Sequence, residues 1–376
     1  MKTATNMKFV MFADLHLERP FAWAEPGAAL RRREAIRQTL ENIVTLAVDE
    51  RADAILCGGD LYEDARFSPD LTQFVASTVD CGIPFLVAPG NHDHLGPASL
   101  YARAAFPSTV HVYDTPDFRP FELTEGVRLW GAAHSAPSGT PGFFDRLRSP
   151  LAGRADGINL GLFHGSERAG FVFEGGDKHP HAPFDVQQIR SAGLDYAFVG
   201  HHHNATTSAL HCYPGNPDPL EFGEDGAPRG AVLATVSADG SVDIEARTVH
   251  TTTTHSIAVD VTGCAHGTEV LARLREAVQP LSGFVRADLT GELDPDVELE
   301  LPLLQDVGRD LDGFLVRVQR VHRAYRLEEI AAEEASVRAH FVRMVQANPE
   351  LDPEDARLML ELGLRAFDNR RDLEVV

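Results

Sequence analysis

Side chains that can bind divalent metal ions cluster at the ends of short apolar runs in the first 205 residues. In order, the clusters are Asp14 with His16, Asp60, Asn91 with His92 and Asp93, the lone His164, and His201 with His203. Carboxylate oxygens, imidazole nitrogens and one amide oxygen suit manganese, iron or zinc rather than calcium or a thiolate cluster. The residue types therefore indicate a metal centre built from oxygen and nitrogen ligands.

The spacing of these residues matches their expected place in the fold. Each follows a predicted strand, and neighbouring strands lie about 5 Å apart and end at one edge of a sheet, so their ligands converge there. Residues i and i+2 of an extended segment point the same way, which pairs Asp14 with His16 and His201 with His203. His202 then points elsewhere and is incidental to the pair.

The elements that must position these residues alternate along the first part of the chain. Apolar, strand-like runs are followed by helical patterns over residues 28–49 and 69–80. This order predicts β-α-β-α-β units with buried strands, hence a layered α/β domain. After Pro97 the pattern changes to short strands divided by loops. Residues 137–157 and 165–190, rich in Gly, Pro and charge, are interpreted as long functional loops.

A domain boundary is expected near residues 250–256, the stretch HTTTTHS. Beyond it, two apolar strands and a helix over residues 267–278 predict a small α/β unit. Residues 327–347 are expected to be helical, and Asp352 and Pro353 begin another helix. The apolar stripe assigned to residues 327–347 comprises Val337, Phe341, Met344 and Val345.

The composition, 43% hydrophobic and 24% charged, is that of an ordinary globular protein. We expect a cytoplasmic protein, because there is no signal-peptide pattern, no long apolar run and no disulfide framework among the four scattered cysteines. The net charge of −22 argues against nucleic acid, since phosphate binding favours a basic surface. Arginine supplies nearly all of the positive charge, however, and its planar fork suits phosphate.

The order of the polar clusters resembles one protein family. The motifs are Asp14-x-His16, Gly59-Asp60, Gly90-Asn91-His92-Asp93, a lone His164 and Gly200-His201-x-His203. Together they are similar to those of the calcineurin-like metallophosphoesterase superfamily, and their joint occurrence is more specific than any single short motif. The resemblance implies a layered α/β metallophosphoesterase sandwich, with two central sheets flanked by helices.

The resemblance also implies two divalent metal ions bridged by Asp60. The ligands fall into two groups of three: Asp14, His16 and His203 for the first ion, and Asn91, His164 and His201 for the second. Manganese is the ion that the resemblance favours, with iron and zinc as alternatives. Such a centre polarises a phosphoryl oxygen and supplies a metal-bound hydroxide for in-line attack.

His92 is not a metal ligand in the family. The resemblance gives it the role of stabilising the transition state or protonating the leaving oxygen, with Asp93 supporting the loop. A nearby carboxylate would orient His92. This chain reads GDLYED where the family often has a GDLFD-like motif, so Glu63 and Asp64 are both candidates for that carboxylate.

The region after the last motif resembles DNA repair exonucleases of the SbcD type, and most closely their bacterial YhaO-like branch. The stretch YPGNPDPLEFGEDG, residues 213–226, is similar to the YPGS-like turn and acidic glycine loop of those proteins. The resemblance implies a phosphoesterase domain over residues 1–250, a small α/β capping domain over 255–325 and a C-terminal helical segment over 327–376. It further implies DNA as substrate, an ABC-type coiled-coil ATPase subunit (SbcC-like) as partner, and a homodimer as one assembly.

Two functions stay open at this point. One is a DNA exonuclease or endonuclease subunit in DNA repair, which the long region after the last motif favours. The alternative is a small-molecule phosphodiesterase acting on a cyclic nucleotide or other metabolite, for which the acidic charge is less awkward. A scaffold with a degenerate site is disfavoured, because every expected ligand is present.

Other polar residues have simpler interpretations. His94 and His134 lack a supporting motif and are expected to be structural. Four more histidines are interpreted as loop or surface residues: His111, His179, His181 and His211. Residues 31–33, three consecutive arginines, begin a helix and are expected to form a solvated face, with a DNA-backbone contact as the alternative.

Overall fold

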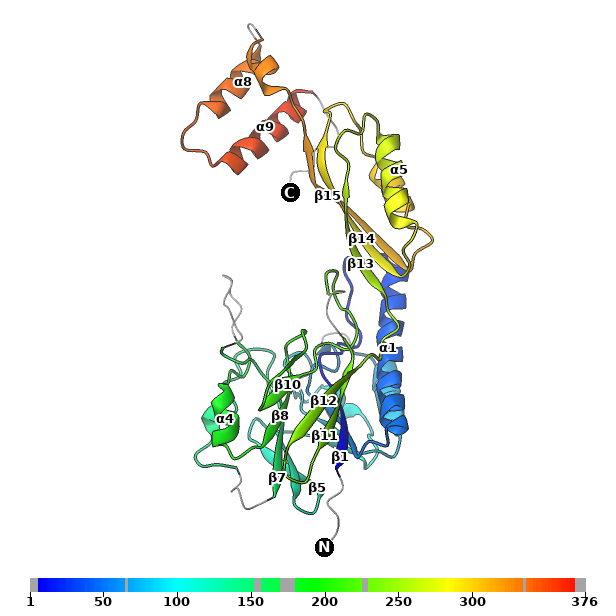
Figure 1. Cartoon of the computed structure of the whole chain (residues 1–376), viewed down its shortest axis with the longest axis vertical. Coiled ribbons are helices and arrows are strands. Elements are labelled where there is room, and N and C mark those ends of the chain that lie inside the picture. Colours follow the sequence, from blue (N-terminus) through cyan, green and yellow to red (C-terminus); the bar gives the residue numbers. More distant parts are fainter. Residues whose placement is uncertain are drawn as a thin grey trace. The chain divides into compact units, whose positions relative to one another are not determined.

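The computed structural model describes residues 6–64, 67–151, 157–169, 180–224, 229–333 and 336–368. The chain divides into an N-terminal unit, Met1–Thr253, and a C-terminal unit, Thr254–Val376. Each unit contains its own sheets and helices (Figure 1). No helix among the described residues is long and apolar enough to cross a membrane.

Two six-stranded sheets form the centre of the N-terminal unit (Figure 1). The first contains, in spatial order, β12 (Val242–Arg247), β11 (Ala231–Val236), β1 (Met7–Phe12), β2 (Ala54–Cys57), β3 (Phe85–Val87) and β4 (Val110–Val112). The second contains β5 (Arg119–Thr124), β6 (Val127–Gly131), β7 (Ile158–His164), β8 (Tyr196–Gly200), β10 (His211–Tyr213) and β9 (Thr206–Thr207). Strands β1 to β4 are parallel to one another, and so are β6, β7, β8 and β10, so their carboxyl ends share an edge in each sheet.

Alternation along β1 shows how the layers pack. Phe9 and Met11 point into an apolar cluster shared with the second sheet, where the Phe9 ring lies 6.3 Å from that of Phe198. Val10 and Phe12 point the other way, into a cluster shared with helices. The strand is therefore buried on both faces, as expected for parallel strands between two layers.

Helices cover the outer faces of the two sheets. Helices α1 (Pro26–Asp49) and α2 (Pro69–Thr78) pack on the first sheet, and α4 (Val186–Ser191) packs on the second through Ile189. A short α3 (Leu100–Arg103) and a 3₁₀ turn, η2 (Phe144–Arg146), complete the described helices of this unit. The predicted two-sheet sandwich flanked by helices is confirmed. Helix α4 lies within residues expected to form a loop, which corrects that part of the prediction.

The C-terminal unit contains a three-stranded parallel sheet and five helices in its described residues. The strands are β13 (Thr254–Asp260), β14 (Phe284–Leu293) and β15 (Gly313–Arg323), with α5 (Gly267–Val278) and α6 (Leu301–Asp306) contributing to one apolar cluster. The helices α7 (Leu327–Ala331), α8 (Val337–Gln346) and α9 (Pro353–Phe367) share a second cluster. The helix predicted over residues 267–278 is confirmed at both ends.

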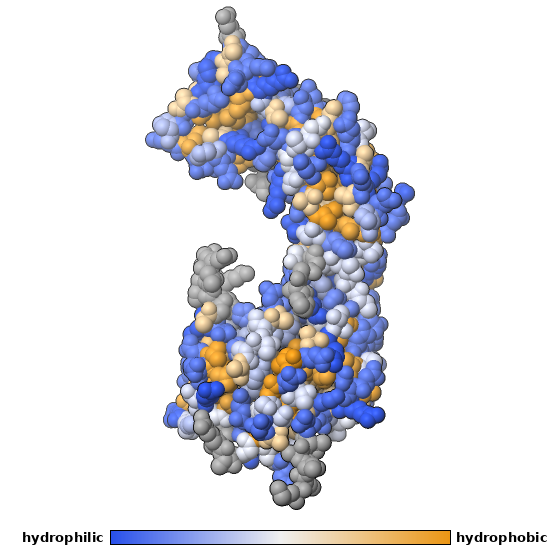
Figure 2. Space-filling model, in the orientation of Figure 1, coloured by the Kyte–Doolittle hydropathy of each residue, from blue (hydrophilic) through white to orange (hydrophobic). Residues whose placement is uncertain are grey.

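The apolar stripe predicted for residues 327–347 is right for two of its four residues. Val345 is buried and Phe341 packs against the same apolar cluster, whereas Val337 and Met344 are 74% and 61% exposed. Ala339 and Val342 are buried in their place, so the buried face of α8 is rotated from the predicted stripe. Figure 2 shows apolar side chains gathered over α8 and α9.

Candidate metal centre

Backbone hydrogen bonds join the loops that follow the strands of the first sheet. The Asp14 N–H donates to the Gly59 carbonyl, and the His16 N–H donates to the Asp60 carbonyl, both at 3.0 Å. The loop after β1 thereby runs alongside the loop after β2. Asp14, His16 and Asp60 are all buried as a result.

The second sheet brings its residues to the same place. His164 pairs with Gly200 in the register of β7 and β8, so His164 lies next to His201. The His201 N–H donates to both carboxylate oxygens of Asp14, at 3.0 and 3.2 Å. This contact ties the strand ends of one sheet to those of the other.

Left-handed backbone conformations aim several of these side chains. Asp14, His16 and Asp60 have φ values of 56°, 53° and 52°, and His201 has 111°. Non-glycine residues adopt positive φ rarely, because the Cβ atom crowds the backbone. The prediction that Asp14 and His16 converge through the alternation of an extended strand therefore gave the wrong reason. Their convergence comes from a strained turn of the kind that clusters at functional sites.

The first donor group consists of Asp14, His16 and His203. One ligand atom from each lies within 4.8 Å of the other two. The His16 Nε2 atom is buried, has no hydrogen-bond partner among the described residues, and lies 3.8 Å from Asp60 Oδ2. An unsatisfied buried polar atom costs about 1–3 kcal/mol. A cation at this position would satisfy it, so the donor group fits a metal ion.

The second donor group surrounds His164. Its Nε2 atom lies 3.1 Å from Asn91 Oδ1, 3.2 Å from His201 Nδ1 and 3.3 Å from Asp60 Oδ2. Ligand atoms of Asp14, Asp60 and His164 also lie within 4.8 Å of one another. Four oxygen and nitrogen donors thus crowd one position, as a divalent transition metal requires.

Asp60 is the charge that the two groups share. Burial alone would lower the pKa of His164, but the Asp60 carboxylate outweighs burial and raises the pKa to about 9. Burial would raise the pKa of Asp60, but His164 and His16 hold it well below its usual range. Burial and His164 lower the pKa of His201 to about 2. A divalent cation would take the place of the proton that Asp60 otherwise holds on His164.

Glu63 connects His16 to His92. Its Oε1 atom lies 2.9 Å from His16 Nδ1, and its Oε2 atom lies 3.0 Å from His92 Nδ1. The hydrogen bond to Glu63 raises the pKa of His92. Asp64 reaches His92 only through its backbone N–H, which donates to the His92 carbonyl at 3.1 Å. Of the two candidate carboxylates, the geometry favours Glu63.

Asp93 fixes the loops beneath the cluster. Its buried carboxylate accepts hydrogen bonds from the backbone N–H groups of Asp60, Leu61 and Gly90, at 3.0, 2.8 and 2.6 Å. The Tyr101 hydroxyl donates a fourth, at 2.5 Å. Asp93 therefore acts through the backbone, as the expected loop support. A Cβ atom at Gly90 would collide with the Asp60 carboxylate, which explains the glycine.

The same arrangement occurs in a known protein family. Residues 7–205, more than half of the chain, match the calcineurin-like phosphoesterase family. The chain belongs to this family. It is therefore a hydrolase, and the cluster at its strand ends is a candidate dinuclear metal site.

Three relatives of this phosphoesterase extend the match beyond residue 205. The uncharacterized metallophosphoesterase YhaO of Bacillus subtilis is 29% identical over 340 residues, covering 84% of this chain and 78% of that protein. The DNA double-strand break repair protein Mre11 of Aeropyrum pernix is 24% identical over 309 residues, covering 77% and 71%. Mre11 of Halobacterium salinarum is 24% identical over 306 residues, covering 77% and 73%. These relatives are consistent with an SbcD-like phosphoesterase.

Two other histidines of the phosphoesterase support the cluster from outside it. The His202 ring packs edge-on against Tyr213, 4.6 Å between centroids, and against His201, 5.7 Å between centroids. The buried His134 contacts the His164 carbonyl through Nε2 at 2.8 Å and Thr140 through Nδ1 at 2.9 Å. Burial lowers the pKa of His134 to about 3, so it is neutral. The position of His134 fits the structural role expected for it, whereas His202 was expected to be incidental to the pair.

Two residues interpreted as loop or surface groups, His211 and Arg32, are buried, whereas His181 lies in a loop as expected. His211 is buried in β10 and contacts Glu167 at 3.2 Å, so its surface assignment is wrong. His181 is half-buried, with its ring 5.4 Å from that of His201 and its Nδ1 atom without a partner among the described residues. Arg32 is fully buried, which overturns the solvated face expected of it. Neither buried placement follows a local sequence pattern, and His179 lies outside the described residues.

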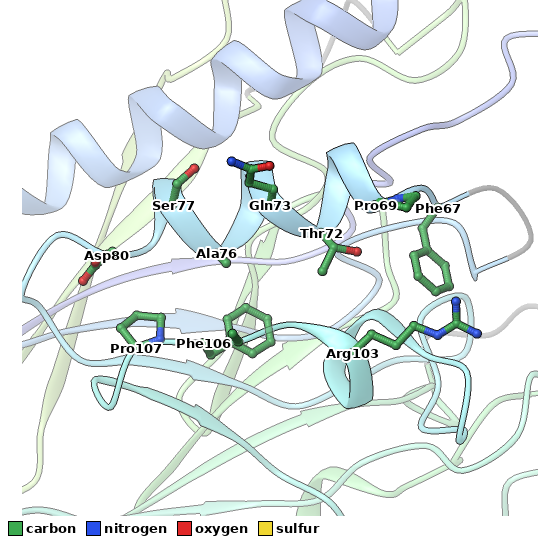
Figure 3. Close-up of a pocket in the computed structure, with 11 residues that line it drawn as sticks. Phe67, Pro69, Thr72, Gln73, Ala76, Ser77, Asp80, Arg103, Phe106 and Pro107 are labelled. Carbon is green, nitrogen blue, oxygen red and sulfur yellow. The ribbon is translucent and has the colours of Figure 1, made fainter.

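An apolar groove of the phosphoesterase shares no residue with the metal cluster. It has a volume of about 670 Å³ and lies between α2 and the segment after α3. In Figure 3, Thr72 and Ala76 of α2 face Phe106 and Arg103 across it. Its lining residues include no cluster of buried titratable side chains. We therefore place the candidate catalytic site at the strand ends and not in this groove.

Proposed function

We propose that the protein hydrolyses phosphodiester bonds in DNA by a two-metal mechanism. The observation that carries the proposal is that Asp60 lies between two donor groups, with His92 beside them. The Mre11 relatives, named for DNA double-strand break repair, support DNA as the substrate because they match about three quarters of the chain.

The ligands of this proposal fall into the two groups that the geometry brings together. Asp14, His16 and His203 would hold one ion, Asn91, His164 and His201 the other, and Asp60 both. When bound, two divalent cations, with manganese as our choice, would polarise a phosphoryl oxygen and activate a water for in-line attack. The chain's own task is to hold these seven donors in place. Asp93 and the backbone hydrogen bonds between the loops after β1 and β2 do so for Asp14, His16 and Asp60.

His92 would protonate the leaving oxygen. The His92 N–H of the backbone donates to Asp60 Oδ1 at 2.8 Å, so the residue is fixed next to the shared carboxylate. Its side chain is 44% exposed, so a substrate can reach it. Glu63 accepts the Nδ1 proton and leaves Nε2 as the atom that faces substrate. General acid catalysis of this kind contributes about 10²–10⁴-fold to the rate.

An ATPase partner would reconcile DNA binding with the net charge of −22. Phosphate binding favours a basic surface, which a coiled-coil ABC-type ATPase subunit can supply. Exposed apolar residues on α8 and α9, among them Met344, Leu358 and Phe367, form the surface that we assign to this partner. We propose that residues 327–376 act as this docking segment and 255–325 as a capping domain. Equal DNA affinity with and without the ATPase would contradict the assignment.

The net charge also favours a second candidate, a phosphodiesterase of cyclic nucleotides or related metabolites. A small dianionic or monoanionic substrate needs fewer phosphate contacts than a DNA backbone does. The same metal cluster and the same His92 would serve this reaction, so the two candidates differ in substrate alone.

A manganese titration on end-labelled linear double-stranded DNA tests the proposal. Bis-p-nitrophenyl phosphate and a cyclic dinucleotide are assayed in parallel, with EDTA and His92→Ala as negative controls. His266→Ala, an exposed histidine that precedes α5, is the matched control. We expect manganese-dependent DNA degradation that EDTA and His92→Ala abolish and His266→Ala retains. Turnover of the small diesters alone, with the candidate ATPase and ATP present or absent, would overturn DNA as the substrate.

A further inference from the structure

Described residues of the loop between β10 and β11 contact His203, one of the proposed metal ligands. The His203 carbonyl accepts hydrogen bonds from the Asn216 N–H at 3.2 Å and from Arg229 Nη1 at 2.8 Å. The His203 ring faces the same loop, with Nδ1 lying 3.7 Å from Glu224 Oε1, an ion-pair distance. Both the backbone and the ring of His203 are therefore held from one side.

Glu224 is itself held in place. Its Oε2 atom accepts hydrogen bonds from Asn216 Nδ2 and from the Leu220 N–H, both at 2.9 Å. Asn216 is fully buried, and the Glu224 side chain is 17% exposed. Two donors on one oxygen leave the other oxygen directed at His203. A carboxylate fixed in this way can fix a histidine in turn.

A buried ion pair anchors the same loop at Asp218, between Asn216 and Glu224. Asp218 Oδ1 accepts from Arg32 Nη2 at 2.8 Å, and Asp218 Oδ2 accepts from Thr39 at 2.8 Å and from Thr252 at 3.1 Å. Arg32 Nη1 also donates to Thr252 Oγ1 at 2.7 Å. The side chains of Arg32 and Asp218 are 1% and 0% exposed.

The burial of this pair needs a reason other than stability. Desolvation of two charges costs several kcal/mol, and well-packed apolar residues often serve stability equally well. The Asn216 amide, which holds Glu224, also donates to the Asp218 carbonyl at 2.9 Å. The pair thus fixes the part of the loop that contacts His203, a proposed metal ligand.

We propose that Glu224 is a positioning residue for His203, and that the buried Arg32–Asp218 pair braces the loop that carries it. The Glu224 carboxylate faces Nδ1 of His203 at an ion-pair distance of 3.7 Å, which favours the proton on Nδ1 and leaves the Nε2 lone pair for the ion. A ligand histidine commonly donates its second nitrogen to a carboxylate, which fixes the ring and its tautomer. This inference rests on the proposed function, because it takes His203 to be a ligand.

The test is the manganese binding isotherm of the full chain, measured by titration calorimetry. Glu224→Gln keeps the shape of the side chain, and its amide oxygen can still accept the hydrogen bonds from Asn216 and Leu220. The substitution removes the negative charge that faces His203. We expect one of two manganese ions to bind about 10–100-fold more weakly, and the other to bind as in the wild type. The exchange-coupled paramagnetic resonance signal of the ion pair should give way to that of a single ion.

The control is Glu245→Gln, which removes an exposed carboxylate of β12 from the same unit. It should leave both manganese affinities unchanged, and the thermal unfolding of metal-free Glu224→Gln should match that of the wild type. Wild-type affinities for both ions in Glu224→Gln would overturn the positioning role alone. A wild-type chain that binds no divalent ion would overturn the proposed function, and this inference with it.

Asp218→Asn tests the brace separately. It should weaken the same ion by a smaller factor, and its effect should be non-additive with that of Glu224→Gln, because both act through one loop. Strictly additive effects, or a change in the other ion, would contradict a shared role for the pair and Glu224.

Discussion

The N-terminal and C-terminal units both pack parallel strands against helices, but they differ in the residues that stand at the ends of those strands. In the N-terminal unit, Asp14, Asp60 and His164 are buried at or just after strand ends. In the described part of the C-terminal unit, no carboxylate or imidazole is buried, and Thr254, 8% exposed, is the one buried polar residue besides the Cys264 thiol. The same kind of sheet therefore occurs with and without buried carboxylates and imidazoles at its edge.

Backbone conformation divides the two units in the same way. Among the described residues, eight other than glycine have positive φ, and all of them lie in the N-terminal unit. Strained turns and buried charges both cost folding free energy, so they persist where chemistry requires them. The comparison teaches that strand topology gathers side chains at an edge, whereas the loops decide whether that edge becomes a site.

The largest expected effect is a loss of kcat, and it should occur for only one of two histidines that each lie beside a glutamate. His92 lies 3.0 Å from Glu63 in the N-terminal unit, and His322 lies 3.4 Å from Glu361 in the C-terminal unit. His92→Ala should lower kcat on bis-p-nitrophenyl phosphate by about 10²–10⁴-fold while manganese stays bound, because a proton donor is lost. His322→Ala should leave kcat unchanged. An equal loss of kcat in the two variants would contradict the assignment of the catalytic site to the N-terminal unit.

Breaking a buried ion pair of the N-terminal unit should lower the free energy of unfolding more than breaking an exposed ion pair of the C-terminal unit. Arg32→Met leaves Asp218 buried without its partner and should lower the free energy of unfolding by about 3–5 kcal/mol. Arg338→Met breaks a pair with Asp368 whose side chains are 32% and 26% exposed, and should cost less than about 1 kcal/mol. Urea denaturation measures both. A cost for Arg32→Met near that of Arg338→Met would show that the buried network holds nothing in place.

Neighbouring carboxylates provide the next comparison. Glu63→Gln removes the charge that orients His16 and His92 and should lower kcat/KM by about 10–100-fold. Asp64→Asn should change it little, because Asp64 contacts His92 only through the backbone. The pair of variants is measured on bis-p-nitrophenyl phosphate at saturating manganese. A larger loss for Asp64→Asn would reverse the assignment.

The smallest effect concerns the register of α8. Val342→Ala removes buried methyl groups and should cost about 1–3 kcal/mol of unfolding free energy. Val337→Ala, at a 74% exposed position, should stay within about 0.5 kcal/mol of the wild type. Chemical denaturation of the two variants distinguishes the observed register from the one predicted by sequence. The reverse order of costs would restore the predicted stripe.

Sequence reasoning found the strand-end residues because they follow recognisable apolar runs. The rule that parallel strands end at a common edge placed Asp60 and His164 together, and the place of His164 among the family motifs distinguished it from a structural histidine. The paired sheets follow from the same runs, since strands such as β1 are apolar on both faces. The choice between Glu63 and Asp64 stayed open, because adjacent residues on one loop cannot be told apart without coordinates.

Long-range contacts account for the features that the sequence did not reveal. Arg32 is buried where it pairs with Asp218. The two residues are 186 positions apart in the sequence, so no helical pattern could reveal their contact. Glu224 reaches His203 across a loop with no periodicity. The positive φ of Asp14 and His16 depends on the neighbouring loop, so strand alternation predicted their convergence for the wrong reason.

The most direct test of the central claim is the number of manganese ions bound per chain, with and without Asp60. The wild-type protein is equilibrated with manganese, freed of excess metal and analysed by inductively coupled plasma mass spectrometry beside Asp60→Asn. We expect two ions per chain in the wild type and nearly none in the variant, because one carboxylate serves both donor groups. Two ions in both proteins, or none in the wild type, would contradict a dinuclear centre bridged by Asp60.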